Sequence, residues 1–325
     1  MNAVIPAERT VSVTTYGRLH LGFFNLSRET QRQFGSVGVA IDAFQTSLSI
    51  SGGPQQLALD PWASAILQRH LAACEMQAEL NVTIQQAIPR HGGLGSGTQM
   101  ALALGAAANS LLDRPVEAAA IAAIHQRGAR SGIGIATFEH GGLVVDGGRN
   151  AQTIVPPMLA RHAFPSDWHF LLIMDNSRDG LHGQGEKTAF KQLAPQSLAA
   201  TQAIQQQLLS QGLPALIEQD FAGFSQFIGA LQAYNAEYFA PAQGGAYASK
   251  AVAGILQTLQ QQGYAGVGQT SWGPTGFVLL PSRAAAVAMQ MQLLTEYAEQ
   301  TTLGFLVTAA VNQPACIKII EDVAN

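Results

Sequence analysis

The stretch IPRHGGLGSGTQMALALG, residues 88–105, runs from a glycine-rich segment directly into an alanine- and leucine-rich helical pattern. Four glycines lie within six consecutive positions: Gly92, Gly93, Gly95 and Gly97. Glycine has no Cβ, so this backbone can turn tightly and approach a ligand closely. Ser96 and Gln99 have the spacing of a capping box, which predicts that a helix begins there. The N–H groups of a first helical turn, together with the helix dipole, attract an anion.

The glycine-rich stretch does not match the standard nucleotide-binding patterns. It contains neither G-x-G-x-x-G nor Gly-Lys-Ser/Thr. Glycine-rich turns between a strand and a helix also occur as plain connections, but the glycine density and the cap together favour an anion site. We assign the contacts to a phosphate or pyrophosphate to six residues: Gly93, Gly95, Ser96, Gly97, Thr98 and Gln99.

Composition limits the classes of partner. The chain of 325 residues is 47% hydrophobic and 12% charged, with a formal net charge of −4. Without an overall positive field, nucleic acid is not expected as a partner. We find no signal-peptide pattern and no apolar run of about 18 residues, so a cytoplasmic protein that does not bind membranes is expected. A chain of this length is also compatible with a homodimer.

The order of patterns predicts an α+β fold in which helices pack on mostly antiparallel sheets. The segment TIVPPMLARHAFPSD, residues 153–167, is proline-rich and lacks periodicity. It therefore marks a domain boundary. We predict an N-terminal domain at 1–155, which holds the glycine-rich loop, and a C-terminal α+β domain at 165–325.

Three motifs together resemble those of the GHMP kinase superfamily, which includes galactokinase and the homoserine and mevalonate kinases. PRHGGLGSGTQ (89–99) is similar to its loop Pro-x-x-x-Gly-Leu-Gly-Ser-Ser. YGRLHLGFFNL (16–26) is similar to the N-terminal motif but lacks the Gly-Glu-His ending. GVGQTSWGPTGFVLL (266–280) takes the place of the C-terminal glycine motif. The resemblance implies the two-domain GHMP kinase-like fold.

Two departures from the kinase pattern bear on the chemistry. Kinases such as mevalonate kinase carry a catalytic Asp in a Ser-Gly-x-Asp segment, and here SGIG places Gly134 at that position. The second loop serine is replaced by Gly97. Loss of the base removes a component typically worth about 10²–10⁴-fold in proton-transfer catalysis. Ordinary phosphoryl transfer to a hydroxyl group is therefore disfavoured.

The departures coincide with one branch of the superfamily. GLGSGTQ, SGIG…FE.GG..VDGG and Q.SWGPTG resemble the β-ribofuranosylaminobenzene 5′-phosphate synthases of tetrahydromethanopterin biosynthesis. The resemblance implies that 5-phosphoribosyl-1-pyrophosphate is joined to 4-aminobenzoate or 4-hydroxybenzoate, with release of CO₂ and pyrophosphate. It implies a loop that holds pyrophosphate rather than ATP. Mg²⁺ is expected with such a substrate, but no metal-ligand cluster is recognisable in the sequence.

Catalytic candidates come from the N-terminal motif and from the segment of the lost base. Strand alternation places Arg18 and His20 on one face, about 6.6 Å apart, and Leu19, Leu21 and Phe23 on the core face. The polar pair indicates either the wall of a site or an edge-strand salt bridge, and Arg18 can bind a carboxylate or phosphate bidentately. Glu139, close to the lost base, is assigned a role at the ribose hydroxyls or a metal.

Substrate-binding candidates lie in two polar, glycine-rich loops. The loop after residue 175 indicates either a substrate loop that closes as a lid or an ordinary solvated turn. In the second loop Trp272 either stacks on the aromatic substrate or packs in the core. The candidates are Asp175, Arg178, His182, Glu186, Ser271, Trp272 and Thr275.

Two other functions stay open on the sequence alone. One is an ATP-dependent small-molecule kinase whose base is displaced to Glu139 or Asp175. The other is a catalytically silent protein that senses a metabolite.

Overall fold

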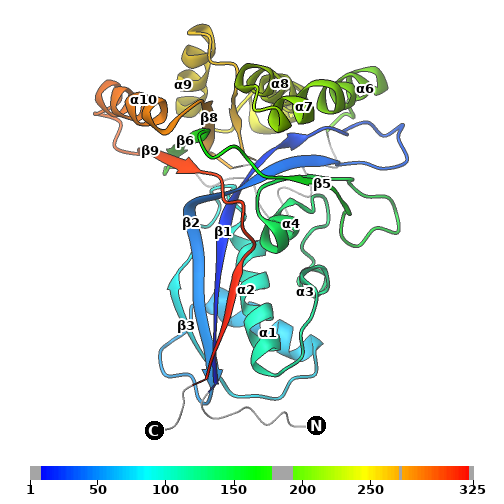
Figure 1. The fold of residues 1–325 in the computed structure, drawn as a ribbon, viewed down its shortest axis with the longest axis vertical. Coiled ribbons are helices and arrows are strands. Elements are labelled where there is room, and N and C mark those ends of the chain that lie inside the picture. Colours follow the sequence, from blue (N-terminus) through cyan, green and yellow to red (C-terminus); the bar gives the residue numbers. More distant parts are fainter. Residues whose placement is uncertain (1–8, 178–192, 271–272, 322–325) are drawn as a thin grey trace.

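The computed structural model describes residues 9–177, 193–270 and 273–321. Its strands form two sheets, and each strand pair within these ranges is antiparallel. Helices lie beside both sheets (Figure 1). The predicted α+β class is confirmed.

The larger sheet has the strand order β10-β1-β2-β4-β5, with β3 also paired to β2. Helices α1 to α4 lie together on one side of it (Figure 1). The strands are β1 (Arg9–Phe23), β2 (Ser36–Gly52), β3 (Leu80–Gln86), β4 (Leu143–Asp146), β5 (Met158–His162) and β10 (Cys316–Glu321). The helices are α1 (Pro61–Ala73), α2 (Ser96–Leu111), α3 (Ala118–Ile124) and α4 (Ile133–His140).

The smaller sheet has the order β7-β8-β6-β9. The second group of helices surrounds it at the other end of the molecule (Figure 1). The strands are β6 (His169–Asp175), β7 (Val267–Gln269), β8 (Gly276–Leu280) and β9 (Leu303–Ala309). The helices are α6 (Leu198–Gln207), a π-helical turn (Leu208–Gly212), α7 (Leu213–Ile217), α8 (Phe221–Gln243), α9 (Lys250–Gln261) and α10 (Arg283–Glu296).

The predicted domain boundary differs from the sheets in two places. The strand β5 forms inside the proline-rich segment and pairs with β4, with Leu143 opposite His162. The last strand, β10, returns to the first sheet and pairs with β1, with Val11 opposite Ile319. Residues 316–321 therefore complete the N-terminal sheet, although they lie in the segment 165–325 that we predicted as the second domain.

A shared hydrophobic core joins the two parts of the molecule. One cluster of buried side chains includes Leu19 of β1, Phe170 of β6 and Phe224 of α8. A second cluster lies between the larger sheet and α1 to α3, and it includes Val11 and Leu104. Because the first cluster spans both sheets, it holds the end of β1 in a fixed position against α8.

Candidate active site

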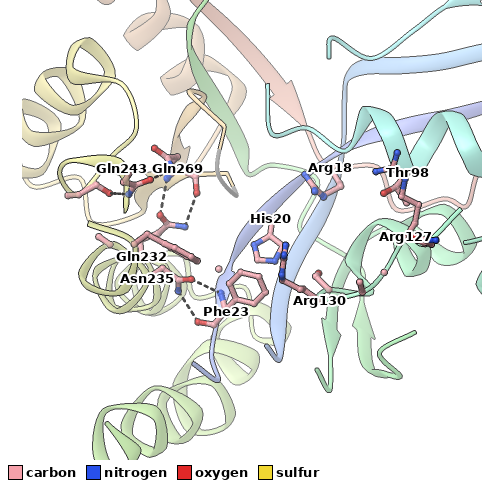
Figure 2. Close-up of a pocket in the computed structure, with 18 of the residues that line it drawn as sticks. Arg18, His20, Phe23, Thr98, Arg127, Arg130, Gln232, Asn235, Gln243 and Gln269 are labelled. Atoms are coloured by element: carbon pink, nitrogen blue, oxygen red, sulfur yellow. Dashed lines mark hydrogen bonds between the residues drawn. The ribbon is translucent and has the colours of Figure 1, made fainter. Parts of the chain in front are cut away.

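A cavity of about 420 Å³ opens where the end of β1 meets α2 and α8 (Figure 2). Its walls come from segments that are far apart in the sequence. The side chains that line it include Arg18, His20, Phe23, Thr98, His125, Arg127, Arg130, Ser131, Gln232, Asn235, Phe239, Gln243 and Gln269.

The glycine-rich loop packs against the turn that follows β7. A Cβ on Gly93 would lie 2.6 Å from the carbonyl oxygen of Thr270, and one on Gly273 would lie 2.3 Å from the carbonyl oxygen of Gly92. Gly93 also has φ 76°, a conformation that favours glycine. Thr270 Oγ1 donates a hydrogen bond of 3.0 Å to the Gly93 carbonyl. Two of the three sequence motifs therefore touch directly.

Helix α2 begins at Ser96, but the predicted capping box is wrong. The cap residue is Gly95, in a left-handed conformation and without a side-chain cap. The Gln99 side chain is fully buried; it accepts a hydrogen bond from Thr15 Oγ1 and donates one of 2.7 Å to the Gly134 carbonyl. Gln99 therefore ties α2 to β1 and α4. Of the six predicted phosphate-loop residues, Thr98 lines this cavity.

A β-bulge near the end of β1 corrects the predicted alternation. The register changes between His20, which is opposite Gly38, and Gly22, which is opposite Val37. Gly22 has φ 142°, which favours glycine. One extra residue shifts the phase of the strand, so Phe23 lines the cavity with Arg18 and His20 rather than sharing the opposite face with Leu19. The glycine in LHLGFF was the available signal.

His20 is a neutral imidazole at the centre of the wall. Its side chain is 4% exposed, and its Nε2 has no hydrogen-bond partner within the described part of the chain. Burial, and then the charge of Arg18, lower the pKa of His20 to about 3. Its ring lies 4.5 Å from that of Phe23, centroid to centroid. The predicted position of His20 on a site wall agrees with this geometry.

Three arginines line the cavity: Arg18, Arg127 and Arg130. The Arg18 Nη1 donates a hydrogen bond to the Gly93 carbonyl, so this side chain lies along the glycine-rich loop. No Asp or Glu occurs among the described residues of the lining. The cavity is therefore cationic and suits an anion. Arg127 and Arg130 were not among the predicted site residues, although both precede the SGIG motif in the segment RGARSGIG.

The opposite side of the cavity is aromatic and amide-rich. The rings of Phe23 and Phe239 lie 6.2 Å apart. Asn235 accepts a hydrogen bond of 2.8 Å from the N–H of Phe23, and Gln232 donates one of 2.6 Å to the Leu21 carbonyl. These amides of α8 therefore fasten the bulged end of β1, and Figure 2 shows the hydrogen bonds between Asn235 and Phe23. Because the amides bond to backbone, the rings form the apolar surface of this side.

Gly134 lies against the first turn of α2. A Cβ on Gly134 would be 3.2 Å from Thr98 Cγ2. The position that corresponds to the kinase base thus lies against α2 at Thr98, and it has no side chain here. Close packing of α4 on α2 leaves little room for one.

Asp146 is a buried carboxylate below the cavity. It accepts hydrogen bonds from Ser36 Oγ (2.6 Å), Ser131 Oγ (3.1 Å) and the N–H groups of Gly132 (2.8 Å) and Gly148 (2.9 Å). Burial raises the pKa of Asp146 to about 6, although each of these bonds lowers it. Asp146 therefore holds Ser131, a cavity residue, at the start of α4. Sequence reasoning did not single out this residue.

The remaining predicted site residues have mixed positions. Glu139 lies near the end of α4, where it accepts a hydrogen bond from the backbone of Ala118 at the start of α3. It is not part of the cavity lining, and burial raises its pKa. Asp175 accepts a hydrogen bond of 2.6 Å from Ser249 Oγ, at the start of α9. Thr275 is buried beside Gly92. Five predicted residues lie outside the described ranges: Arg178, His182, Glu186, Ser271 and Trp272.

The donor atoms of the cavity do not fit a resident metal ion. Mg²⁺ is usually held by carboxylates and by substrate phosphates. Within the described ranges, no group of three or more His, Cys, Asp or Glu side chains is arranged to hold a metal. None of the helices in those ranges combines the length and hydropathy that a membrane span requires.

Two family models match the chain: the GHMP kinases N terminal domain at residues 62–142 and the GHMP kinases C terminal model at residues 213–299. Solved structures agree in fold. A homoserine kinase from Cytophaga hutchinsonii has a TM-score of 0.63 at 17% identity, over 96% of this chain and 97% of that one. The mevalonate diphosphate decarboxylase from Enterococcus faecalis has a TM-score of 0.65 at 16% identity, over 96% and 99%. The chain belongs to the GHMP kinase superfamily.

Curated relatives identify the branch. A β-ribofuranosylphenol 5′-phosphate synthase from Methanothermobacter thermautotrophicus is 24% identical over 301 residues, covering 85% of this chain and 90% of the relative. The protein of the same name from Archaeoglobus fulgidus is 29% identical over 298 residues, covering 86% and 90%. The chain is thus an enzyme of this synthase branch, as its motifs predict.

Proposed function

We propose that the enzyme forms a carbon–carbon bond between C1 of 5-phosphoribosyl-1-pyrophosphate and the carboxylate-bearing ring carbon of a 4-substituted benzoate, in tetrahydromethanopterin biosynthesis. One observation carries the proposal. A single cavity has a cationic side beside a helix N-terminus, without carboxylates among its described residues, and a facing side with two phenyl rings. These two sides match a sugar pyrophosphate and an aromatic acid.

The reaction balances without a carboxylate base. The bond from C1 to the pyrophosphate oxygen breaks, and its electron pair leaves with pyrophosphate. The ring carbon supplies the pair that bonds to C1. The bond to the carboxylate then breaks, CO₂ leaves, and its pair restores the aromatic ring. No proton is removed from the attacked carbon, so the glycine at position 134 is compatible with this chemistry.

Different residues of the cavity wall act on the two substrates. Arg18 and Arg130 stabilise the negative charge that develops as pyrophosphate departs. The benzoate ring packs on Phe23. With a hydroxy acid, the Nε2 of neutral His20 accepts a hydrogen bond from the ring hydroxyl, which keeps its proton throughout, so no net proton is consumed.

We propose 4-hydroxybenzoate as the preferred acceptor, with 4-aminobenzoate as the comparison. The names of the curated relatives specify a ribofuranosylphenol product, which corresponds to the hydroxy acid. The unpartnered Nε2 of His20 supports the same choice, because a neutral imidazole nitrogen can accept a hydrogen bond from a hydroxyl group.

Mg²⁺ is proposed as part of the substrate rather than as a resident cofactor. Pyrophosphate oxygens chelate Mg²⁺, and the described cavity offers no carboxylate to compete for it. The arginines then supply the protein's share of the positive charge.

The test is release of label from carboxyl-labelled acids. The enzyme, 5-phosphoribosyl-1-pyrophosphate and Mg²⁺ are expected to release labelled CO₂ from 4-hydroxybenzoate, with one pyrophosphate per CO₂, and more slowly from 4-aminobenzoate. Absence of release from both acids would rule out the proposal. ATP consumption with a panel of alcohols would instead support a kinase, and tight binding without turnover a sensor. Light scattering on the same sample checks the expected homodimer.

A further inference from the structure

Arg127 lies against the glycine that departs from the kinase loop. Gly97 is the second residue of α2. A Cβ on Gly97 would lie 3.0 Å from Arg127 Nη2 and 3.1 Å from both Cζ and Nη1. Three atoms of the guanidinium group therefore lie within 3.1 Å of the position that a Cβ of residue 97 would occupy. The bare backbone of Gly97 makes room for the arginine.

The same arginine faces the cavity. Arg127 and Thr98, the next residue of α2, both line it, and Figure 2 shows them side by side. The first turn of a helix has N–H groups that lack intrahelical partners, and the guanidinium adds a full positive charge above them. A serine at position 97 would meet the guanidinium at less than ordinary van der Waals distance.

A second observation also indicates that a ligand occupies this cavity. The side chain of His20 is 4% exposed and lines the same space, and its Nε2 has no hydrogen-bond partner in the described ranges. A buried polar atom without a partner is costly unless a ligand or water satisfies it. The first turn of α2, the arginine and the histidine thus line one cavity that suits a ligand.

We propose that Arg127 binds the departing pyrophosphate directly and that Gly97 is the specificity-determining residue that admits it. This inference rests on the proposed function. As the bond between C1 and the pyrophosphate oxygen breaks, the electron pair stays on that oxygen, and the N–H groups of Arg127 stabilise the added charge together with the first turn of α2. By this proposal, the replacement of the loop serine by Gly97 changes the ligand of the loop from ATP to pyrophosphate.

The experiment compares Gly97→Ser, Arg127→Ala, Arg127→Lys and the double variant Gly97→Ser/Arg127→Ala. Calorimetry with inorganic pyrophosphate measures binding, and the labelled-CO₂ assay gives KM and kcat. Loss of a charged hydrogen bond predicts about 10- to 100-fold weaker pyrophosphate binding in Gly97→Ser and in Arg127→Ala. The double variant is expected to lose little more, because both changes remove the same contact. Arg127→Lys should recover part of the binding.

Two matched controls lie far from the cavity. Gly254→Ser adds the same side chain to α9, where a Cβ would meet nothing within 4 Å, and Arg283→Ala removes an exposed arginine of α10. Both should bind pyrophosphate as the wild type does. Circular dichroism establishes whether each variant is folded. If Arg127→Ala does not fold, Arg127→Lys is used in its place to test the role of Arg127.

The outcomes separate this inference from the proposed function. Wild-type pyrophosphate affinity in folded Gly97→Ser and Arg127 variants would overturn the inference, even if the wild type releases CO₂. Weaker pyrophosphate binding in these variants, with no CO₂ release by the wild type, would support the anion contact and reject the proposed reaction.

Discussion

The backbone N–H of His20 donates a hydrogen bond of 2.9 Å to Thr270 Oγ1, a residue 250 positions away in the sequence. The same hydroxyl donates to the carbonyl of Gly93. Thr270 is fully buried, so water cannot replace either bond. One side chain thus joins the N-terminal motif, the glycine-rich loop and the C-terminal glycine turn.

Thr270→Val keeps the shape of the side chain but leaves the His20 N–H and the Gly93 carbonyl without this partner. We expect the free energy of unfolding to fall by about 1–3 kcal/mol and kcat/KM to fall as the loop loses its position. Urea unfolding and the CO₂ assay measure the two effects. Thr270→Ser should recover both, whereas Thr258→Val in α9, where the hydroxyl makes an exposed hydrogen bond to the Gly254 carbonyl, should change neither. Equal stability of Thr270→Val and wild type would contradict the link.

Gly134→Ala tests the close contact between α4 and α2. The added Cβ would be 3.2 Å from Thr98 Cγ2, so the helices must separate slightly. We expect a loss of about 1–2 kcal/mol in unfolding free energy and weaker pyrophosphate binding, although alanine is the better helix former. Gly134→Asp, which restores the kinase residue, should lose synthase activity without gaining a kinase activity.

Gly254→Ala is the matched control for position 134. It also lies inside a helix, but a Cβ there meets nothing within 4 Å. Helix propensity alone then predicts a gain of about 0.5–1 kcal/mol. If urea unfolding shows that both glycine variants gain stability, the packing argument at Gly134 fails.

The lowered pKa of His20 predicts how the free energy of unfolding depends on pH. Its pKa of about 3 in the folded protein is below the ordinary 6.5, so the unfolded chain binds a proton that the folded chain refuses. Its contribution to stability is complete above pH 6.5 and is lost as pH falls towards 3, by up to about 1.4 kcal/mol per pH unit. Urea unfolding between pH 7 and 5 should show a shallower decline for His20→Gln than for the wild type. Parallel curves would show that His20 is not a buried imidazole with a lowered pKa.

The raised pKa of Asp146 predicts a pH dependence of stability with the opposite sign. Its pKa of about 6 exceeds the ordinary 3.8, so the stability linked to this carboxyl is present below pH 3.8 and is lost as pH rises through about 6. The difference in unfolding free energy between Asp146→Asn and the wild type should therefore shift in favour of the variant from pH 4 to 7.

At any one pH, Asp146→Asn should also disturb the cavity. An amide accepts hydrogen bonds at one oxygen only, so it cannot satisfy the donors that Asp146 accepts from Ser131, Gly132 and Gly148. A lower kcat/KM that Ser131→Ala reproduces in part would indicate that Asp146 acts by positioning Ser131. A pH-independent stability difference would contradict the assigned pKa of Asp146.

The motifs alone were enough for the fold and the branch of the superfamily. The density of glycines before α2 indicated an anion site, and Gly134 in place of an aspartate argued against an ordinary kinase. Local patterns carry such information because close backbone approach requires glycine wherever it occurs. The strand pattern of β1 also placed Arg18 and His20 on one wall.

Other features depended on contacts between distant segments. The bulge that turns Phe23 towards the cavity depends on α8, whose Asn235 holds the Phe23 backbone. The capping-box prediction was wrong because Gln99 bonds to Thr15 and Gly134, which no local pattern reveals. The return of β10 to β1 crossed the predicted domain boundary for the same reason.

The sequence by itself determined that this chain has a glycine-rich loop before a helix and a glycine where the kinases carry their base, because both properties follow directly from residue type. Only the tertiary structure decided what surrounds that loop. Arg127 meets Gly97, and His20 is buried to a pKa of about 3, because packing brings separate segments together and excludes water from between them.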